Sequence, residues 1–134
     1  MKRIIVKLLP FAALFIGVFL LLYPTVSEHI NALHRSRAIR NYNEIAESLS
    51  DEEHDRIIEA AREYNKKLAE AENPIIEPEK VHGYNETLDI TGTGIMGYVT
   101  IDKIKVELPV YHGVDDNVLQ IAAGHLPGSS LPIG

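Results

Sequence analysis

An almost uninterrupted apolar run from Leu8 to Tyr23 constrains the fold of this chain more than any other feature of its sequence. With residues 4–6 before it, the run reaches the roughly 20 residues that a helix needs to cross a bilayer. Such a run is typical of a segment that enters a membrane, not of a helix in a soluble core. We therefore interpret residues 1–25 as a membrane anchor or signal segment.

The charges around this run predict its orientation. Three basic residues precede it, and no charged residue occurs in residues 8–27. This asymmetry favours an N-terminus inside the cell and an extracytoplasmic remainder, although three arginines between residues 35 and 40 weaken it. Small residues at 25–27 leave a cleavable signal peptide as the alternative. The apolar run is longer than a usual h-region, which favours an uncleaved, single-pass anchor in the cell membrane.

The composition excludes several classes of function. The 134 residues carry 13 basic and 19 acidic side chains, a net charge of −6; without Lys2, Arg3 and Lys7 the balance is 10 against 19, or −9. An ectodomain this acidic is a poor candidate for binding nucleic acid. The sequence contains no cysteine, so disulfides, thiolate metal sites and a thiol nucleophile are excluded within these residues.

Residues 26–72 predict a helical hairpin. Ser50 to Glu53 match a capping box, in which the Ser50 hydroxyl accepts from the Glu53 N–H and the Glu53 side chain reaches back. Asn73-Pro74 ends the second helix, and the very short connection suggests an antiparallel pair. Each helix has a narrow apolar stripe to bury against the other helix or a third body. The stripes are Ile30, Leu33, Ala38, Tyr42, Ile45 and Leu49, and Ile57, Ala61, Tyr64 and Leu68.

Residues 73–93 change character, with turn-prone spots at Asn73-Pro74, Glu77-Pro78 and Gly83. This composition predicts a linker, or a loop that lies over another part of the protein.

Residues 94–134 predict the start of a β domain. The alternation in Met96–Ile101 and in Val106–Tyr111 indicates two strands, and Pro109, which has no N–H to donate, predicts an edge strand or a bulge. Asp115 or Asp116 is expected to cap a short helix, and the tail from Gly124 has the composition of a loop. Because an isolated hairpin is marginal in water, we expect an incomplete domain.

The reactive side chains point to no site by themselves. Histidines spaced as zinc ligands on a helix are absent, so neither a metal nor another cofactor is expected. His125 has Ser129, Ser130 and Tyr111 nearby but no nucleophile elbow, so a catalytic role is disfavoured. The glycines of residues 92–97 precede a strand, whereas a dinucleotide fingerprint follows one. The six histidines are His29, His34, His54, His82, His112 and His125.

Taken together, residues 94–134 resemble the start of a class C, pilus-assembly sortase. The matching motifs run in the family's order and spacing: Gly97-Tyr98, Ile101-Asp102-Lys103-Ile104, Leu108-Pro109-Val110-Tyr111-His112-Gly113, Val118-Leu119-Gln120, Gly124-His125-Leu126 and Gly128-Ser129-Ser130-Leu131-Pro132. The N-terminal membrane segment, the helices with Tyr42-Asn43 and Tyr64-Asn65, and the Pro-containing linker also resemble the family.

The resemblance implies an eight-stranded β-barrel transpeptidase on the outer face of a Gram-positive cell membrane. Such enzymes cut sorting signals of the Leu-Pro-x-Thr-Gly type with a cysteine, hold a thioacyl intermediate, and pass it to a lysine of the next pilin. Thiolate attack, a histidine proton donor and an arginine that stabilises negative charge suit this chemistry. Pilin subunits and the membrane are the implied partners.

The chain departs from the family in two places. It has no cysteine and ends at Gly134, before the stretch where the family's catalytic histidine is expected, so we assign no catalytic residue and expect the chain alone to be inactive. His125 resembles an earlier Gly-His-Leu of the family. The lid of many class C sortases has an Asp-Pro-aromatic motif, whereas this chain has Glu77-Pro78 with no aromatic next to it, so an ordinary solvated linker is the alternative to a lid.

The sequence thus predicts an N-terminal transmembrane helix followed by an α+β region, in which a helical hairpin precedes the first strands of an incomplete sortase-type barrel. The expected segments are 1–25, an anchor or signal; 26–72, a helical hairpin; 73–93, a lid-like linker; and 94–134, a truncated barrel start. The alternative function is a membrane-tethered extracytoplasmic interaction module without enzymatic activity.

Overall fold

The computed structural model describes residues 2–133, with side chains from Leu8 onward. The chain divides into two compact units, residues 1–34 and residues 35–134. Helix α1 (Lys2–Ser48) contributes to both units, and each unit is described by itself below.

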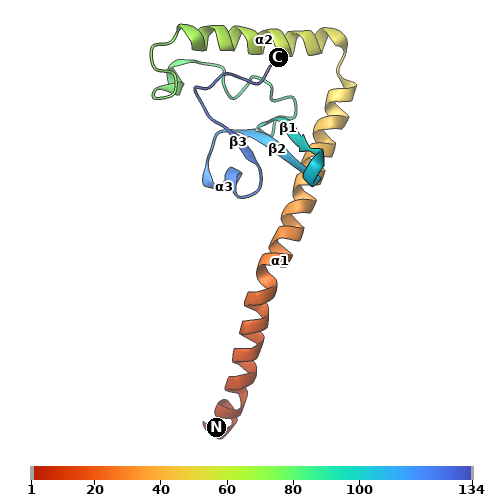
Figure 1. Ribbon diagram of the computed structural model, residues 1–134, viewed down its shortest axis with the longest axis vertical. Coiled ribbons are helices and arrows are strands. Elements are labelled where there is room, and N and C mark those ends of the chain that lie inside the picture. Colours follow the sequence, from red (N-terminus) through yellow and green to blue (C-terminus); the bar gives the residue numbers. More distant parts are fainter. Residues whose placement is uncertain (1, 134) are drawn as a thin grey trace. The chain divides into compact units, whose positions relative to one another are not determined.

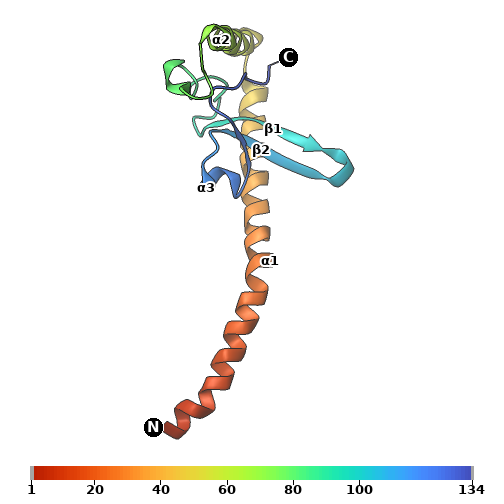
Figure 2. The same cartoon turned by 60° about the vertical axis from the view of Figure 1, so that its left-hand side comes forward.

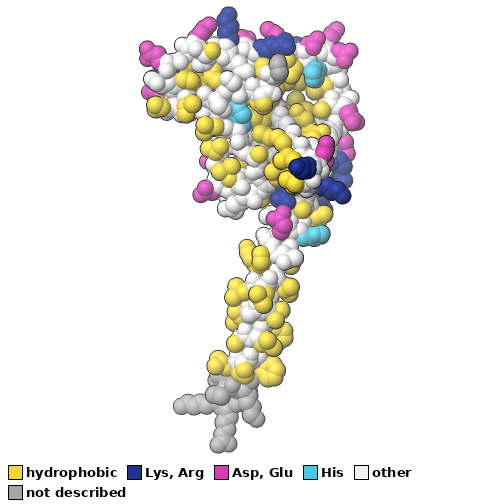
Figure 3. All heavy atoms as spheres, viewed as in Figure 1, with side chains coloured by type: hydrophobic (Ala, Val, Ile, Leu, Met, Phe, Trp, Pro, Cys, Tyr) yellow, Lys and Arg dark blue, Asp and Glu magenta, His cyan; other side chains and the backbone are white. Residues whose placement is uncertain are grey.

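The first unit is the apolar part of α1. The described helix from Leu8 onward has a mean hydropathy of 2.1 over its most apolar window, and it meets the length and composition of a membrane span. An N-terminal signal sequence meets the same criteria. Its large apolar side chains are exposed rather than packed, and Figure 3 shows them along the lower helix. This exposure suits a segment that lipid surrounds.

In the second unit, α2 (Asp51–Glu70) begins with the predicted capping box. The Ser50 hydroxyl accepts a hydrogen bond from the Glu53 N–H at 3.3 Å, and the Glu53 carboxylate accepts from the Ser50 N–H at 3.0 Å. The connection to α1 is as short as predicted. However, α2 crosses the end of α1 instead of running back along it, as Figures 1 and 2 show, so the expected antiparallel arrangement is wrong.

The apolar stripe of α2 explains this arrangement, because it is buried against a third body. Ala61, Tyr64 and Leu68 are buried as predicted, and Ile57 is half-buried. They form one core with residues far along the chain, namely Val81, Met96 and Leu131. On the end of α1, Ile39 is buried, whereas Ile30 and Leu33 of the predicted stripe are exposed. Burial against the loops and strands therefore decides where α2 lies.

Three strands form a small mixed sheet in the order β1-β2-β3. Strand β1 (Ile95–Ile101) pairs antiparallel with β2 (Val106–His112), and a short 3₁₀ helix, η2 (Asp102–Ile104), connects them. The register shifts between Ile95 and Gly97, which places a bulge at the start of β1. The sheet is open, as expected of a partial barrel.

The tail of this region differs from the predicted loop. The tail contributes β3 (Ala123–His125), which pairs parallel with β2 at Val110–His112, so Gly124 and His125 do not lie in a loop. Strand β2 is therefore central only at residues 110–112. Among the described residues, Pro109 has β1 alone as a neighbouring strand, because β3 starts to pair one residue later, so the predicted edge position is correct at Pro109.

The short helix occurs where it was predicted, as α3 (Asp116–Leu119). Asp115 occupies the N-cap position, but its side chain forms no capping hydrogen bond there. The backbone turn alone starts this helix.

The linker between α2 and β1 lies over the core. Of the two alternatives predicted for it, the loop that lies over another part of the protein is the one observed. It contains a 3₁₀ helix, η1 (Pro78–Lys80), and it buries Val81 and Thr87. Leu88 has a positive φ of 67°, a conformation that costs an ordinary L-residue about 1–2 kcal/mol. The surrounding contacts must therefore hold this loop in place.

Candidate functional site

The linker meets the sheet at the hydroxyl of Tyr84. This hydroxyl donates to the main-chain oxygen of His125 at 2.7 Å and accepts from the Gly113 N–H at 3.1 Å. Burial raises the pKa of Tyr84, although the bond from Gly113 acts in the opposite direction. Tyr84 therefore keeps its proton at neutral pH and joins the linker to the ends of β2 and β3.

The ring of His125 contacts residues of this junction and is not arranged as part of an active site. Its Nδ1 lies 3.0 Å from the Tyr84 hydroxyl, and its Nε2 lies 3.0 Å from the Ser130 carbonyl oxygen. That oxygen can only accept, so Nε2 carries a proton in this arrangement. Ser129 lies 3.3 Å from Nε2 but donates its own proton to Leu126. His125 is thus not placed to act as a general base toward Ser129.

His112 fastens the linker from the other side. Its Nδ1 lies 3.0 Å from the Gly94 oxygen and its Nε2 lies 2.9 Å from the Thr87 oxygen. Both partners are main-chain carbonyls, which only accept hydrogen bonds, so the imidazole lies between two acceptors. The Tyr84 ring stands edge-on to the imidazole, with the centroids 4.9 Å apart. One side chain thereby ties both ends of the segment from Thr87 to Gly94.

Asp89 closes the turn within this segment. Its carboxylate accepts from the N–H groups of Thr91 and Thr93, each at 3.2 Å, and of Gly94 at 2.9 Å. Three main-chain donors for one carboxylate fix the backbone that leads into β1.

Two residues of the helices hold the strand region. Asn65 of α2 forms a two-way clamp on Leu131: its Nδ2 donates to the Leu131 oxygen at 3.1 Å, and its Oδ1 accepts from the Leu131 N–H at 2.7 Å. Tyr42 of α1 donates to the Met96 oxygen at 3.4 Å and packs edge-on against Tyr98. Tyr42 and Asn65 belong to the two pairs that resemble the sortase pattern.

The predicted lid residues lie at the start of η1. Pro78 is its first residue, and Glu77 precedes it. The Glu77 carboxylate forms an ion pair with Lys80, one turn along. Glu79 lines a cavity of about 490 Å³ beside η1, together with His112 and Asp115.

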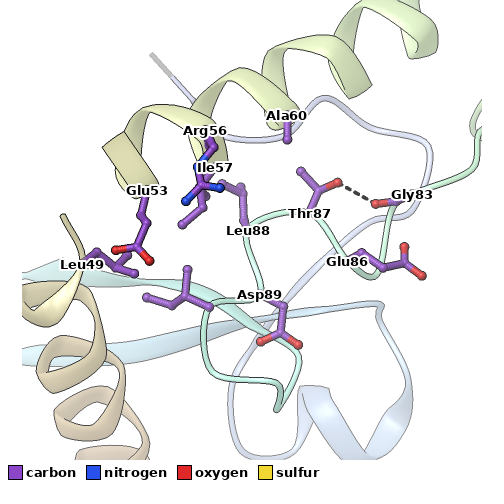
Figure 4. Close-up of a pocket in the computed structure, with 11 residues that line it drawn as sticks. Leu49, Glu53, Arg56, Ile57, Ala60, Gly83, Glu86, Thr87, Leu88 and Asp89 are labelled. Atoms are coloured by element: carbon purple, nitrogen blue, oxygen red, sulfur yellow. Dashed lines mark hydrogen bonds between the residues drawn. The ribbon is translucent and has the colours of Figure 1, made fainter. Parts of the chain in front are cut away.

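A second cavity, of about 520 Å³, lies between α2 and the linker. Figure 4 shows Leu88 pointing toward Ile57, while Asp89 points away from α2. Two polar groups on its wall have partners: Thr87 donates to the Gly83 oxygen at 2.6 Å, and Glu53 caps α2. Its lining offers neither an activated nucleophile nor an acid–base pair, so we assign it no chemistry.

The other four histidines lie on the helices and in the linker. His29 and His34 are on α1, His54 is on the first turn of α2, and His82 is exposed in the linker. Among the described residues, no group of three or more His, Cys, Asp or Glu side chains is arranged to hold a metal ion. Sequence reasoning missed the roles of Tyr84, His112 and Asp89, because their partners are distant or main-chain atoms.

Solved structures of class C sortases resemble this chain. Sortase C1 from Streptococcus agalactiae is 38% identical, with a TM-score of 0.59, over 72% of this chain and 50% of that one. Sortase C1 of GBS pilus island 1 is 30% identical, with a TM-score of 0.60, over 75% and 47%.

A third structure shows Clostridium perfringens sortase C in complex with the C-terminal cell wall sorting signal motif. It is 30% identical, with a TM-score of 0.53, over 72% of this chain and 46% of that one. The chain thus spans about half the length of the solved structures it matches. No protein-family model and no curated protein matches the sequence.

Proposed function

Since this chain belongs to the class C sortase family and spans about half the length of its solved relatives, we propose that it forms the N-terminal part of a membrane-anchored cysteine transpeptidase. The enzyme would join pilin subunits through sorting signals of the Leu-Pro-x-Thr-Gly type. The observation that carries this proposal is the 38% identity to a sortase C1 over 72% of the chain. The complex of the Clostridium perfringens relative with a sorting signal motif supports the substrate class.

The four segments take separate roles in this proposal. Residues 1–25 anchor the enzyme with a single pass, and the remainder is extracytoplasmic. Residues 26–72 form the helical support, residues 73–93 the lid-like linker, and residues 94–134 the first strands of the barrel. The basic residues before the apolar run support this orientation.

The catalytic groups would lie outside these 134 residues. The reaction needs a thiolate nucleophile, and the sequence has no cysteine. His125, which resembles an earlier Gly-His-Leu of the family and not its catalytic motif, has its Nε2 beside the Ser130 oxygen. The contribution of this part is therefore structural: Tyr84, His112 and Asn65 hold the linker and α2 on the strands that a complete barrel would use.

In the proposed enzyme the linker lies across the substrate cleft, with Glu77 and Pro78 in the lid position. The ion pair joins Glu77, which precedes η1, to Lys80 at its end. If the linker is a lid, replacing Glu77 by alanine should raise peptide cleavage in a catalytically complete enzyme. Unchanged cleavage would favour an ordinary solvated linker.

A transfer assay tests the enzymatic proposal. The 134-residue chain is compared with a version extended by the coding sequence downstream of Gly134, using a Leu-Pro-x-Thr-Gly type peptide and a lysine acceptor. We expect thioacyl formation and transfer with the extended version only. If a folded extended version transfers no peptide, the transpeptidase assignment is wrong, and a tethered interaction module is the better account.

A further inference from the structure

A close main-chain contact joins the lid-like linker to the loop after β3. Gly128 is buried, with a φ of +84°, directly beneath the Pro74–Ile75 peptide. A Cβ at Gly128 would lie 2.5 Å from the Pro74 carbonyl carbon and 2.8 Å from the Ile75 Cα, and it would overlap the Pro74 oxygen. These are backbone atoms, which cannot move aside as the end of a side chain can.

The atoms above Gly128 belong to the turn that begins the linker. The N–H groups of Ile76 and Glu77 donate to the Asn73 oxygen at 3.1 and 3.0 Å. Glu77 then leads into η1 at Pro78. A displacement of Pro74 would therefore be transmitted to the two lid residues within four positions of the chain.

Little else holds this turn. Ile75 and Ile76 are 62% and 78% exposed, so their side chains contribute little burial. The nearest buried anchors are Leu68 on α2 and Val81 beyond η1. Between these anchors, the contact with Gly128 sets the distance between the linker and the loop after β3.

We propose that Gly128 is a positioning residue that seats the lid-like linker, so that any side chain at position 128 releases residues 73–80 from the loop below. We call the contact between Gly128 and the Pro74–Ile75 peptide the seat, and it is inferred from the contact geometry alone. Its consequence for peptide cleavage rests on the proposed function. In that enzyme, a released linker leaves the substrate cleft open.

The matched control for this proposal is Gly113. Its φ of +83° equals that of Gly128 within a degree, but an added Cβ there would meet only the Asp115 carboxylate, at an ordinary 3.6 Å. Alanine at either position causes the same backbone strain, because a positive φ is unfavourable for any L-residue. Alanine at 113 keeps the main-chain N–H that donates to Tyr84, and only alanine at 128 places a Cβ against linker backbone atoms.

Hydrogen exchange of the full 134-residue chain in detergent micelles tests the seat. In Gly128→Ala, we expect the amides of Ile76 and Glu77 to exchange at least about tenfold faster, while the amides of β1 and β2 keep their protection. In Gly113→Ala, exchange at 76 and 77 should stay as in the parent chain. Equal exchange in the two variants would overturn the proposal.

A measurement on the unaltered chain covers the case in which Gly128→Ala does not fold. The contact predicts nuclear Overhauser effects between the Gly128 α protons and the α proton of Ile75. Their absence in a folded chain would refute the seat directly.

The effect on activity separates the seat from the proposed function. In a catalytically complete enzyme, a released lid raises the rate of peptide cleavage several-fold or lowers the KM, whereas a merely structural defect lowers the rate. Faster exchange together with raised cleavage supports both the seat and the lid. Faster exchange without raised cleavage keeps the seat and refutes its regulatory consequence.

Discussion

The hydroxyl of Tyr84 donates a hydrogen bond of 2.7 Å to the main-chain oxygen of His125, 41 residues further along the chain. The same hydroxyl accepts from the Gly113 N–H. One phenol in the linker thus joins the ends of two parallel strands, β2 and β3. Because the strands pair over three residues only, this side chain supplies an important part of their connection.

Tyr84→Phe should therefore lower the free energy of unfolding. The variant leaves the Gly113 N–H and the His125 oxygen without their partner, which typically costs about 1–3 kcal/mol. Denaturant unfolding of the full chain, followed by near-ultraviolet circular dichroism, measures the change.

Tyr64→Phe is the control. The Tyr64 hydroxyl is buried and has no hydrogen-bond partner among the described residues, and burial raises its pKa. Removing an unpaired buried hydroxyl should leave stability unchanged or raise it slightly. Equal losses in the two variants would contradict the role assigned to the Tyr84 hydroxyl.

The capping box predicts a pH effect at the start of α2. Hydrogen bonds from the Ser50 N–H and then from its hydroxyl hold the pKa of Glu53 below its ordinary value. A lowered folded-state pKa means that this contribution to stability is present above the pKa of the unfolded chain and is lost as the pH falls through the folded pKa.

Ser50→Ala should raise the pKa of Glu53 part of the way, because the backbone bond remains. It should also cost about 1 kcal/mol of helix stability through loss of the N-cap. Carboxyl chemical shifts, recorded from neutral pH to about pH 3, give the pKa. Ser48→Ala is the matched serine control, since its hydroxyl donates to Ile45 at the end of α1. A Glu53 pKa that is the same in both variants would contradict the prediction.

Local patterns and distant contacts explain which features the sequence predicted. The capping box at Ser50 and the stripe through Ala61, Tyr64 and Leu68 are encoded within a few residues, and both are present. Strand β3 is only three residues long and becomes a strand through its pairing with β2, so its own composition suggested a loop. Hydrophobic periodicity cannot reveal such pairing.

The same reasoning applies to the candidate site. Glu77 and Pro78 could be singled out because they follow each other in a recognisable motif. The tie made by Tyr84 depends on Gly113 and His125, 29 and 41 residues away. No local pattern marks a tyrosine in a polar linker as the partner of two such distant main-chain groups.

The clamp of Asn65 on Leu131 predicts a different result for two substitutions. Asn65→Ala removes both hydrogen bonds and should lower stability by about 1–3 kcal/mol. Asn65→Asp keeps an acceptor for the Leu131 N–H but, when ionised, places an oxygen against the Leu131 carbonyl, so the backbone of the tail should still be released.

Amide exchange at Leu131 measures this release. It should become faster in both Asn65 variants and remain unchanged in Lys66→Ala, which alters an exposed neighbour on α2. A slow Leu131 amide in Asn65→Ala would mean that burial of the leucine side chain, and not the clamp, holds the tail.

The two carbonyl contacts of His112 lead to the last prediction. His112→Phe keeps a ring that can stand edge-on to Tyr84, but it removes the contacts of the imidazole with the Gly94 and Thr87 oxygens, while the His112 N–H still donates to Gly94. Leu88, between these anchors, has a strained positive φ, so we expect the segment from Thr87 to Gly94 to relax and its amides to exchange faster. His82→Phe introduces the same ring at an exposed position of the linker and should leave that exchange unchanged. Because Asp89 binds the N–H groups of Thr91, Thr93 and Gly94 within the same turn, retained protection in His112→Phe would mean that the carboxylate alone holds the loop.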